Sequence, residues 1–350
     1  MHYKPANVTP PLSAVAPPTP SLTDLSGPSA NLRDLTAAKK SRSLWSNAWR
    51  QFRRHRLAMI GLFVLIFIFL ATFVGNSLYP REIDELNFSI TNSPPSADYP
   101  FGTDSLGYDI LARVLWGGRI SLLVGLLSAF VAITVGTLVG AMAGFLGGFT
   151  DSLLMRITDM FISIPQLPLL LVISFLYRDR MYQFFDQNLD DGIAGWLAEQ
   201  ADMDPGNFGV FVLIVLVIAV LNWMATARLV RAQFLSLKEK EFVEAARSIG
   251  ARQWTLMLKH ILPNVLSPII VAATLAVGAA IITESSLSFL GLGFPSDVPT
   301  WGRMLFEYKD YLQLAPYQSL IVGTMIFITV LSINYVGDGL RDALDPRKTG

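Results

Sequence analysis

Cysteine is absent from the 350 residues of this sequence, and histidine occurs only three times. Without cysteine there is no disulfide framework, no thiolate metal site and no cysteine nucleophile. The histidines (His2, His55 and His260) are too scattered for a histidine metal cluster, so we expect no metal site. Charge is scarce too: Asp, Glu, Lys and Arg make up 15% of the chain, against roughly 25% in an ordinary globular protein. So little charge cannot cover a large soluble surface, which indicates a protein whose main solvent is lipid.

The charges that are present balance, with 27 basic and 27 acidic residues. This balance argues against a nucleic-acid-binding protein, which is typically basic. Apolar residues make up 52% of the chain and the mean hydropathy is +0.46. An intrinsically disordered protein is therefore excluded as the state of the whole chain.

Six windows contain no Asp, Glu, Lys, Arg or His and are long enough to cross a membrane as helices, which takes about 17–25 residues. They are 57–80, 120–150, 160–177, 205–227, 261–283 and 311–337. Because a charge at bilayer depth costs roughly 2.5 kcal/mol or more, these windows predict an all-α integral membrane protein with six transmembrane helices. Pro165 and Pro168 are expected to break the third window, and Pro268 to kink the fifth.

Lysine and arginine are distributed unevenly among the segments that join the windows. Alternate segments, beginning with the N-terminal one, carry 20 of these residues together, whereas the others carry seven. Because cytoplasmic loops are enriched in Lys and Arg, the sequence predicts that both termini face the cytoplasm. Segment 81–119 is then external, and 338–350 is a cytoplasmic tail.

The region before the first window has two parts. Residues 1–40 are rich in proline, serine and threonine without an apolar run, which predicts a disordered cytoplasmic tail and no cleaved signal peptide. In segment 41–56, aromatic residues recur at helical spacing with arginines between them: Trp45, Trp49 and Phe52, with Arg50, Arg53 and Arg54. This pattern predicts an interfacial amphipathic helix with its basic side toward anionic headgroups and its apolar side in lipid. The alternative is an unstructured positive flank.

The second window contains three glycines four residues apart: Gly136, Gly140 and Gly144. Such a stripe lets another helix approach closely. It predicts a helix-packing surface, either a static one or one that slides during transport.

No ionisable residue lies deep within any window. Proton- and sodium-coupled carriers usually need one, so an ion-coupled secondary carrier of small polar solutes is kept only as the alternative function. Transport against a gradient would then take its energy from a partner. Uncharged polar residues such as Asn222 and Asn334 are candidates to line a pathway or to form hydrogen bonds between helices. A membrane-embedded hydrolase is disfavoured because cysteine and the H-E-x-x-H motif are both absent.

Segment 228–260 is too patterned for a simple connection. Two apolar helical faces follow each other in it: Phe242, Ala245, Ala246 and Ile249, then Trp254, Met257 and Leu258. Gly250 lies between them as a helix stop. We expect two short helices that turn at Gly250 and form either a docking surface for another protein or a helix pair lying on the membrane.

These residues resemble a known motif. Glu244, Ala245 and Ala246, followed after three residues by Gly250 and then by Leu262 and Pro263, resemble the EAA loop of ABC importer permeases. His260 stands where the consensus has Ile. Four further stretches resemble the C-type permeases of the peptide/nickel branch: 101–122, 155–168, 284–305 and 337–347. Tyr108 occupies a position where that branch has Arg, and the resemblance covers about residues 41–347.

The resemblance implies a type I ABC importer permease fold in a bacterial inner membrane, with residues 120–337 as a five-helix core. It also implies a heterodimer with a B-type permease, two cytoplasmic ATPases seated on the EAA loop, and an external solute-binding protein that delivers di- or oligopeptides or nickel. The sequence lacks the phosphate loop G-x-x-x-x-G-K-S/T. We therefore expect that this chain is not an enzyme, that it binds no cofactor, and that ATP and Mg²⁺ are used by the ATPase subunits.

Two of the stretches that carry this resemblance also have local interpretations. Asp104 or Ser105 is expected to cap a helix over 106–116, and Asp109 is expected to pair with Arg113 at i,i+4. Glu284 and Ser285, at the outer end of the fifth window, are candidates for an external gate. Glu284 either contacts substrate or only anchors the helix end in water.

Overall fold

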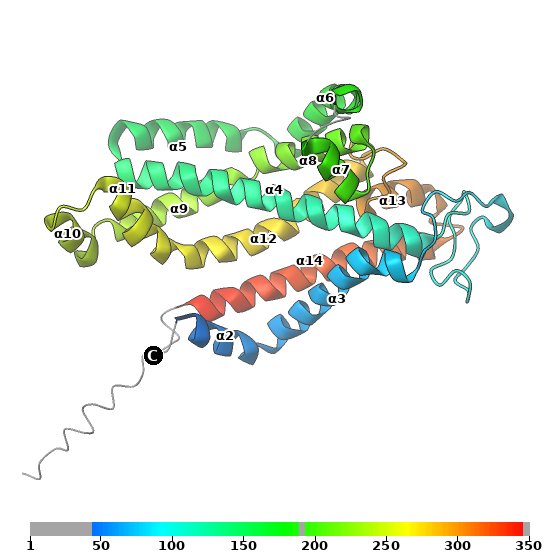
Figure 1. Cartoon of the computed structure of the whole chain (residues 1–350), viewed down its shortest axis with the longest axis horizontal. Coiled ribbons are helices and arrows are strands. Elements are labelled where there is room, and N and C mark those ends of the chain that lie inside the picture. The colour runs from blue at the N-terminus through cyan, green and yellow to red at the C-terminus, as the bar shows by residue number, and fades with distance from the viewer. Residues whose placement is uncertain (1–43, 189–192, 346–350) are drawn as a thin grey trace, which may run out of the picture. The chain divides into compact units, whose positions relative to one another are not determined.

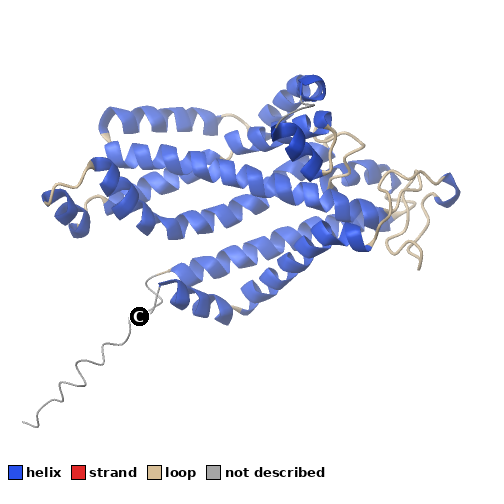
Figure 2. Ribbon diagram, in the orientation of Figure 1, coloured by secondary structure: helices blue, strands red, loops and turns tan. Residues whose placement is uncertain are grey.

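The computed structural model describes residues 44–188 and 193–345 (Figure 1). Every regular element among them is a helix, apart from one isolated β-bridge between Thr103 and Asp109 (Figure 2). The predicted all-α architecture is confirmed. The α-helices are α2 (Leu44–Arg54), α3 (Arg56–Leu78), α4 (Ile110–Leu146), α5 (Gly148–Ser163), α6 (Gln166–Asn188), α7 (Ile193–Ala201), α8 (Pro205–Val220), α9 (Trp223–Leu237), α10 (Glu241–Ser248), α11 (Gln253–Thr255), α12 (Leu262–Phe289), α13 (Trp301–Tyr308) and α14 (Pro316–Leu344). The predicted tail 1–40, the start of segment 41–56 and the end of tail 338–350 lie outside the described residues.

Four helical runs of the described part are long and apolar enough to cross a membrane. They are Arg56–Gly75 in α3, Ile110–Leu146 (α4), Gln253–Phe289 (which ends in α12) and Pro316–Leu344 (α14). Two further pairs meet the same criterion only together: α5 with α6, bent by 83°, and α7 with α8, bent by 89°. The six predicted spans therefore correspond to four continuous helices and up to two bent pairs.

The second span begins earlier than the sequence predicted. α4 starts at Ile110, ten residues before the predicted start at residue 120 and inside the predicted external segment 81–119. The charge-free windows excluded this part because it contains Arg113 and Arg119. Arg113 is nevertheless buried in the helix, because Asp104 from the preceding loop and Glu307 from α13 neutralise it.

The break predicted in the third window, 160–177, is present at Pro165 but not at Pro168. α4 ends at Leu146 and α5 runs from Gly148 to Ser163. Between them the chain turns at Gly147 and Gly148, which both have positive φ (+68° and +54°). Ile164 is extended (φ −82°, ψ 128°), as expected of a residue before proline, so the chain breaks at Pro165. Pro168 does not break the helix, because it lies in the first turn of α6, where no backbone donor is needed.

The remaining spans differ from their windows at their ends. The fourth window, 205–227, contains a break, since α8 ends at Val220 and α9 begins at Trp223. α12 continues to Phe289 beyond the fifth window, and Pro268 lies inside this helix without ending it. α14 is shifted toward the C-terminus relative to the window 311–337, and it begins with Pro316.

The glycine stripe of α4 lies against α9. A Cβ atom built on Gly136 would lie 2.5 Å from the carbonyl oxygen of Trp223, and one on Gly144 would lie 2.6 Å from Cβ of Phe234. A Cβ on Gly140 would overlap the carbonyl oxygen of Ala227. All three glycines are therefore needed for the close approach of these helices.

The long helices pack side by side in pairs. α12 packs against α4 and α14, while α3 packs against α14 and α4 (Figure 1). Buried apolar side chains from α3, α4, α12, α13 and α14 form one cluster: Ile68, Ile110, Val114, Leu122, Ile281, Trp301, Met304, Tyr308, Val322 and Ile333. This cluster holds α13 and the long helices together at the end where α4 begins.

The predicted amphipathic segment before the first span contains the helix α2, but its apolar side does not face lipid throughout. Phe52 is buried and forms a cluster with Ala48, Ala58, Val336 and Ala343. This cluster packs α2 onto the last turns of α14. Trp49 stays half exposed and stacks on Phe52 with ring centroids 5.8 Å apart.

Candidate functional site

The EAA loop (residues 228–260) is built from the end of α9, from α10 and α11, and from a π-helical turn over Leu256–Ile261 that contains His260. α10 ends at Gly250, whose φ is +85°. The amide of Gly250 donates to the carbonyl of Arg247 (3.0 Å), and that of Ala251 donates to Ala246 (3.1 Å). A positive φ suits glycine because it has no Cβ. Nothing lies within 4 Å of a Cβ built there, so the requirement for glycine comes from the backbone alone.

The apolar side chains of α10 point in two directions, which differs from the single face that the sequence predicted. Val243 and Ala246 are buried and pack with residues of α9 and of the π-helical turn. Phe242, Ala245 and Ile249 are exposed, Ile249 to 87%. The chain therefore uses only part of the apolar surface of α10 for its own packing.

The residues of the EAA motif divide in the same way. Glu244 and Ala245 face outward, whereas Ala246 faces inward. Glu244 forms no ion pair with any described residue. Leu262 and Pro263 begin α12, with Leu262 half-buried and Pro263 exposed at a position where proline fits a helix start.

The second predicted apolar face also splits. Met257 is buried, while Trp254 is 66% exposed and Leu258 is 51% exposed. The exposed apolar surface of the EAA loop thus extends from α10 across α11 to the π-helical turn. Monomeric soluble surfaces rarely expose such a set of large apolar side chains together, and a patch of this kind marks a contact with a partner or a membrane.

The part of the EAA loop that belongs to α9 contacts both α5 and α4. Arg231 on α9 binds Asp151 on α5 through two hydrogen bonds, Nε to Oδ1 (2.5 Å) and Nη2 to Oδ2 (2.7 Å). Arg228 pairs with Asp159, about two turns further along α5, at 2.5 Å. Phe234 fills the contact with Gly144. The end of α9, where the loop begins, is therefore held to two neighbouring helices.

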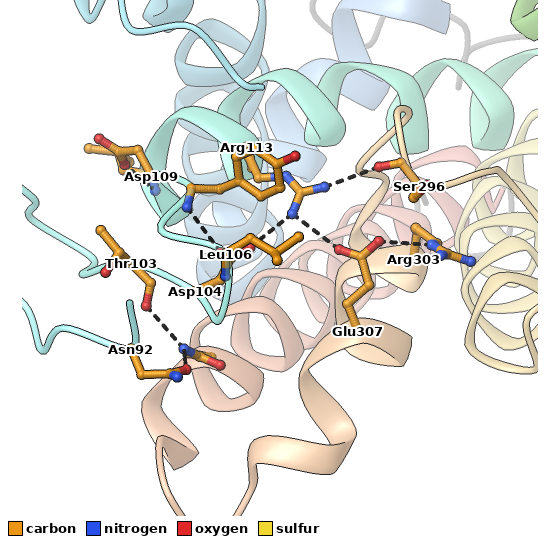
Figure 3. Close-up of polar contacts among 12 residues, drawn as sticks. Asn92, Thr103, Asp104, Leu106, Asp109, Arg113, Ser296, Arg303 and Glu307 are labelled. Atoms are coloured by element: carbon orange, nitrogen blue, oxygen red, sulfur yellow. Dashed lines mark hydrogen bonds and ion pairs between the residues drawn. The ribbon is translucent and has the colours of Figure 1, made fainter. Parts of the chain in front are cut away.

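The opposite end of α4 carries a buried ionic network centred on Arg113 (Figure 3). Nη1 of Arg113 lies 3.0 Å from Oδ2 of Asp104 and 3.1 Å from Oε2 of Glu307, and Nη2 donates to the carbonyl of Ser296 at 3.2 Å. Glu307 also accepts from Nε of Arg303 (2.9 Å). One guanidinium thus joins α4, α13 and two loops. We call these four charged residues, Asp104, Arg113, Arg303 and Glu307, the Arg113 network.

The predicted pair between Asp109 and Arg113 does not form. Asp109 caps α4 instead, since its Oδ1 accepts from the amides of Leu111 and Ala112, and its Oδ2 accepts from the hydroxyl of Tyr79 (2.6 Å). Arg113 turns to Asp104, which tertiary folding brings closer.

Asp104 is likewise not a helix cap, and no helix covers 106–116 as one unit. Oδ1 of Asp104 accepts hydrogen bonds from the amides of Leu106 and Tyr108, and these bonds close a turn before α4. Burial raises the pKa of the Asp104 carboxyl, although the Arg113 guanidinium acts in the opposite direction. The centroid of the Tyr108 ring lies 4.6 Å from the guanidinium carbon of Arg113.

Glu284 is completely buried, with 0% of its surface exposed, so the interpretation that it anchors a helix end in water is wrong. Its Oε1 accepts from the hydroxyls of Ser288 (2.8 Å) and Thr300 (2.9 Å), and its Oε2 lies 3.5 Å from the hydroxyl of Ser285. Thr300 in turn caps α13 by accepting from the amide of Arg303 (3.2 Å). Glu284 therefore ties the start of α13 to α12, and in this conformation no solute reaches it.

The comparisons with known proteins agree with this arrangement. The family described as binding-protein-dependent transport system inner membrane component matches residues 136–350, and the family described as the N-terminal TM domain of oligopeptide transport permease C matches residues 43–95. The chain belongs to the binding-protein-dependent ABC permease family. It is the permease subunit of an importer of the inner membrane and not itself an enzyme.

Similar proteins of this family match over nearly their whole length. The glutathione transport system permease protein GsiD of Shigella flexneri serotype 5b (strain 8401) is 40% identical over 311 residues, which are 88% of this chain and 92% of that protein. GsiD of Escherichia coli O157:H7 is 38% identical over the same shares of the two chains. Membership of the family implies a second permease, ATPase subunits and a binding protein as partners in general.

The four residues predicted for the pathway or gate of this permease do not form one site. Glu284 and Ser285 are buried beside α13. Asn222 lies in the break before α9, donates to the carbonyl of Ile218 (2.7 Å) and lines a cavity of about 300 Å³. Asn334 is exposed on α14 and faces Gly278 of α12. Of the four, only Asn334 has an exposed side chain on one of the long helices.

A larger cavity in the permease was missed by the sequence analysis. It has a volume of about 670 Å³ and lies among α9, α12 and α14, lined by Leu229, Gln233, Asn264, Ser267, Pro268, Val271, Ala272, Leu275, Arg341, Leu344 and Asp345. Its polar residues come from three helices. The sequence contained a signal for it, because Asn264, Ser267 and Val271 recur at helical spacing and so share one face of α12 around Pro268.

Proposed function

We propose that this permease imports short peptides, with glutathione as the first candidate, as one half of a heterodimeric membrane domain with a B-type permease. The observation that supports this cargo is the identity of 40% to GsiD over 88% of the chain. The match of residues 43–95 to the N-terminal part of an oligopeptide permease agrees with it. In this proposal an external solute-binding protein delivers the peptide and selects it.

The EAA loop is proposed as the contact to one of two ATPase subunits, which bind and hydrolyse ATP with Mg²⁺. Its exposed apolar residues, Phe242, Ile249 and Trp254 among them, gain from burial in a cleft of the partner. The unpaired Glu244 beside them would supply a charge for a basic residue of that cleft. Both features fit a docking surface better than a helix pair that lies on lipid, because Glu244 adjoins the apolar residues.

The contacts behind the EAA loop support a mechanical role. α9 is joined to α5 by the pair of Arg231 and Asp151 and to α4 by the close contact at the glycine stripe. A displacement of α10 by closing ATPases would therefore move α9 together with α4 and α5. The cavity of about 670 Å³ and the exposed Asn334 would face the partner permease and form the lining of the pathway.

The orientation in the membrane is part of the proposal. It follows from the 20-to-7 excess of Lys and Arg in the segments that lie on the same side of the membrane as the N-terminus. The EAA loop and both termini would face the cytoplasm, and the Arg113 network would face the outside. Reporter fusions at Ser96 and Asn188 are expected to report an external location, and a fusion at Lys238 a cytoplasmic one. Opposite signals at two of the three sites would overturn this orientation.

Uptake by the reconstituted complex tests the cargo. The permease is co-expressed with the B-type permease, ATPases and binding protein of its own cell, and vesicles are supplied with labelled glutathione, a dipeptide, a pentapeptide or Ni²⁺. We expect ATP-dependent uptake of at least one of the peptides and none of Ni²⁺. Uptake of Ni²⁺ alone would refute the peptide cargo, and uptake driven by an ion gradient without ATP would favour the secondary carrier.

A further inference from the structure

The polar face of α2 carries a cationic patch. Arg50, Arg53 and Arg54 lie on this helix, and Arg56 follows as the first residue of α3. All four are exposed, and none forms an ion pair with a described residue. α2 itself contains no acidic residue. We call these four residues, three on α2 and one at the start of α3, the α2 arginines.

The opposite face of α2 fixes the direction in which the α2 arginines point. Phe52 is 3% exposed and packs on α14 together with Ala48. Nε2 of Gln51 donates to the carbonyl of Asp342 on α14 at 2.9 Å. A Cβ on Gly339 would lie 3.0 Å from the ring of Phe52, so the contact is close. Because this face is fixed on α14, the arginines remain directed away from it.

The position of α2 along the chain places these arginines at the level of the lipid headgroups. The chain breaks only at His55, whose Nδ1 caps α3 by accepting from the amide of Ala58 (3.1 Å). The apolar span Arg56–Gly75 follows directly, and its mean hydropathy of 2.9 is the highest of the candidate spans in the described chain. Trp49, half exposed on α2, is the residue type that prefers the membrane–water interface.

We propose that the α2 arginines bind the phosphate groups of anionic phospholipids and that this lipid contact anchors α2, and through it the end of α14. Arginine offers a planar fork of donors that matches a phosphodiester better than lysine does, and its charge attracts anionic lipid at short range. The occupant is a lipid rather than an acidic protein surface, because the patch adjoins the span that must itself lie in the bilayer. The inference depends on the membrane location of the family and not on the proposed cargo.

Lipid binding is measured on the assembled importer, purified and placed in nanodiscs of phosphatidylcholine with or without phosphatidylglycerol. Retained lipids are counted by native mass spectrometry. Since this chain has no cysteine, Ser46→Cys, labelled on the purified permease before assembly, gives a single site for a spin label that reports the mobility of α2. We expect wild type to retain phosphatidylglycerol preferentially and α2 to become less mobile when it is present.

The decisive variant is the triple substitution Arg50→Gln, Arg53→Gln and Arg54→Gln. Each arginine near an anionic surface contributes about a fivefold preference, so we expect the preference for phosphatidylglycerol to fall by about tenfold or more. The corresponding triple Lys variant keeps the charge and is expected to keep most of the preference. Arg180→Gln removes an exposed charge from α6 and serves as the control without effect.

Three outcomes would overturn the proposal. The first is an unchanged lipid preference in the triple Gln variant with α2 equally immobile. The second is an α2 immobilised only when the ATPase subunits are present, whatever the lipid, which would assign the patch to a protein partner. The third is release of the effect by millimolar inorganic phosphate, which would indicate a soluble anion. The cargo assay of the same samples separates this result from the proposed function, because peptide uptake can fail while lipid binding persists.

Discussion

The regions at the two ends of α4 differ in their side chains: charged groups are buried at one end, and large apolar groups are exposed at the other. At its N-terminal end, the charges of Arg113, Asp104 and Glu307 satisfy one another in a buried network, and Glu284 is surrounded by hydroxyl groups. At its C-terminal end, the EAA loop leaves Ile249 and Trp254 in solvent and Glu244 without a described partner. At the first end the charges are neutralised within one chain, whereas the second end leaves large apolar side chains uncovered. Substitutions at the first end should therefore affect folding, and substitutions at the second should affect assembly.

The largest effect is expected from Arg113→Ala. It leaves the carboxylates of Asp104 and Glu307 without their shared cation, and breaking a buried ion pair on one side costs about 3–5 kcal/mol. Thermal unfolding of the purified permease should show a strongly lowered midpoint and low yield. Arg156→Ala, at an exposed position of α5, is the control. Equal stability of the two variants would contradict the interpretation of the Arg113 network as a folding element.

The next largest effect is expected at the glycine stripe, which packs the C-terminal part of α4 against α9. Gly140→Val forces atoms into the carbonyl of Ala227 on α9, and overpacking of this kind costs about 1–3 kcal/mol or more. Gly323→Val on α14 is the matched control, because nothing lies within 4 Å of a Cβ there. Both variants are compared by thermal unfolding and by ATPase retention. Equal behaviour would show that α4 and α9 tolerate separation.

A third prediction concerns the exposed surface of the EAA loop. Ile249→Asp should leave the thermal midpoint nearly unchanged, because the side chain is 87% exposed. It should weaken ATPase retention by roughly thirtyfold, the equivalent of about 2 kcal/mol at an interface hot spot. Val243→Ala, its buried neighbour on α10, should show the reverse pattern. Normal co-purification of the Ile249 variant with active ATPases would remove the loop from the interface.

The smallest effect is expected from Gly250→Ala. The φ of +85° costs a residue with a Cβ about 1 kcal/mol, and no steric clash adds to it. We expect slightly reduced stability of the loop and a higher ratio of ATP hydrolysed to solute imported. Gly250→Asn should lose less, since Asn tolerates this conformation better. Identical coupling in wild type, Ala and Asn variants would show that the turn does not need this backbone conformation.

Sequence reasoning was most successful where the physics is local. The apolar windows identify the long helices because a charge in lipid is costly, and Pro165 and Gly250 end helices through their own backbone preferences. Sequence reasoning was least successful where a residue distant in the sequence neutralises a buried charge. Arg113 interrupts no helix, because Asp104 and Glu307 neutralise it, and neither partner can be identified from spacing. The pair predicted between Asp109 and Arg113 was wrong for the same reason.

That this chain is helical, lies in a membrane and carries an EAA loop follows from its sequence, since composition, window length and motif spacing are properties of the chain alone. Which side of α10 stays exposed, that Arg113 lies inside α4 and that Glu284 is buried follow from the packing of the folded chain. Those outcomes depend on which surfaces the neighbouring helices cover. Phe242 and Val243 are adjacent apolar residues on one short helix, yet one is exposed and the other is buried, because α9 and the π-helical turn cover only one side.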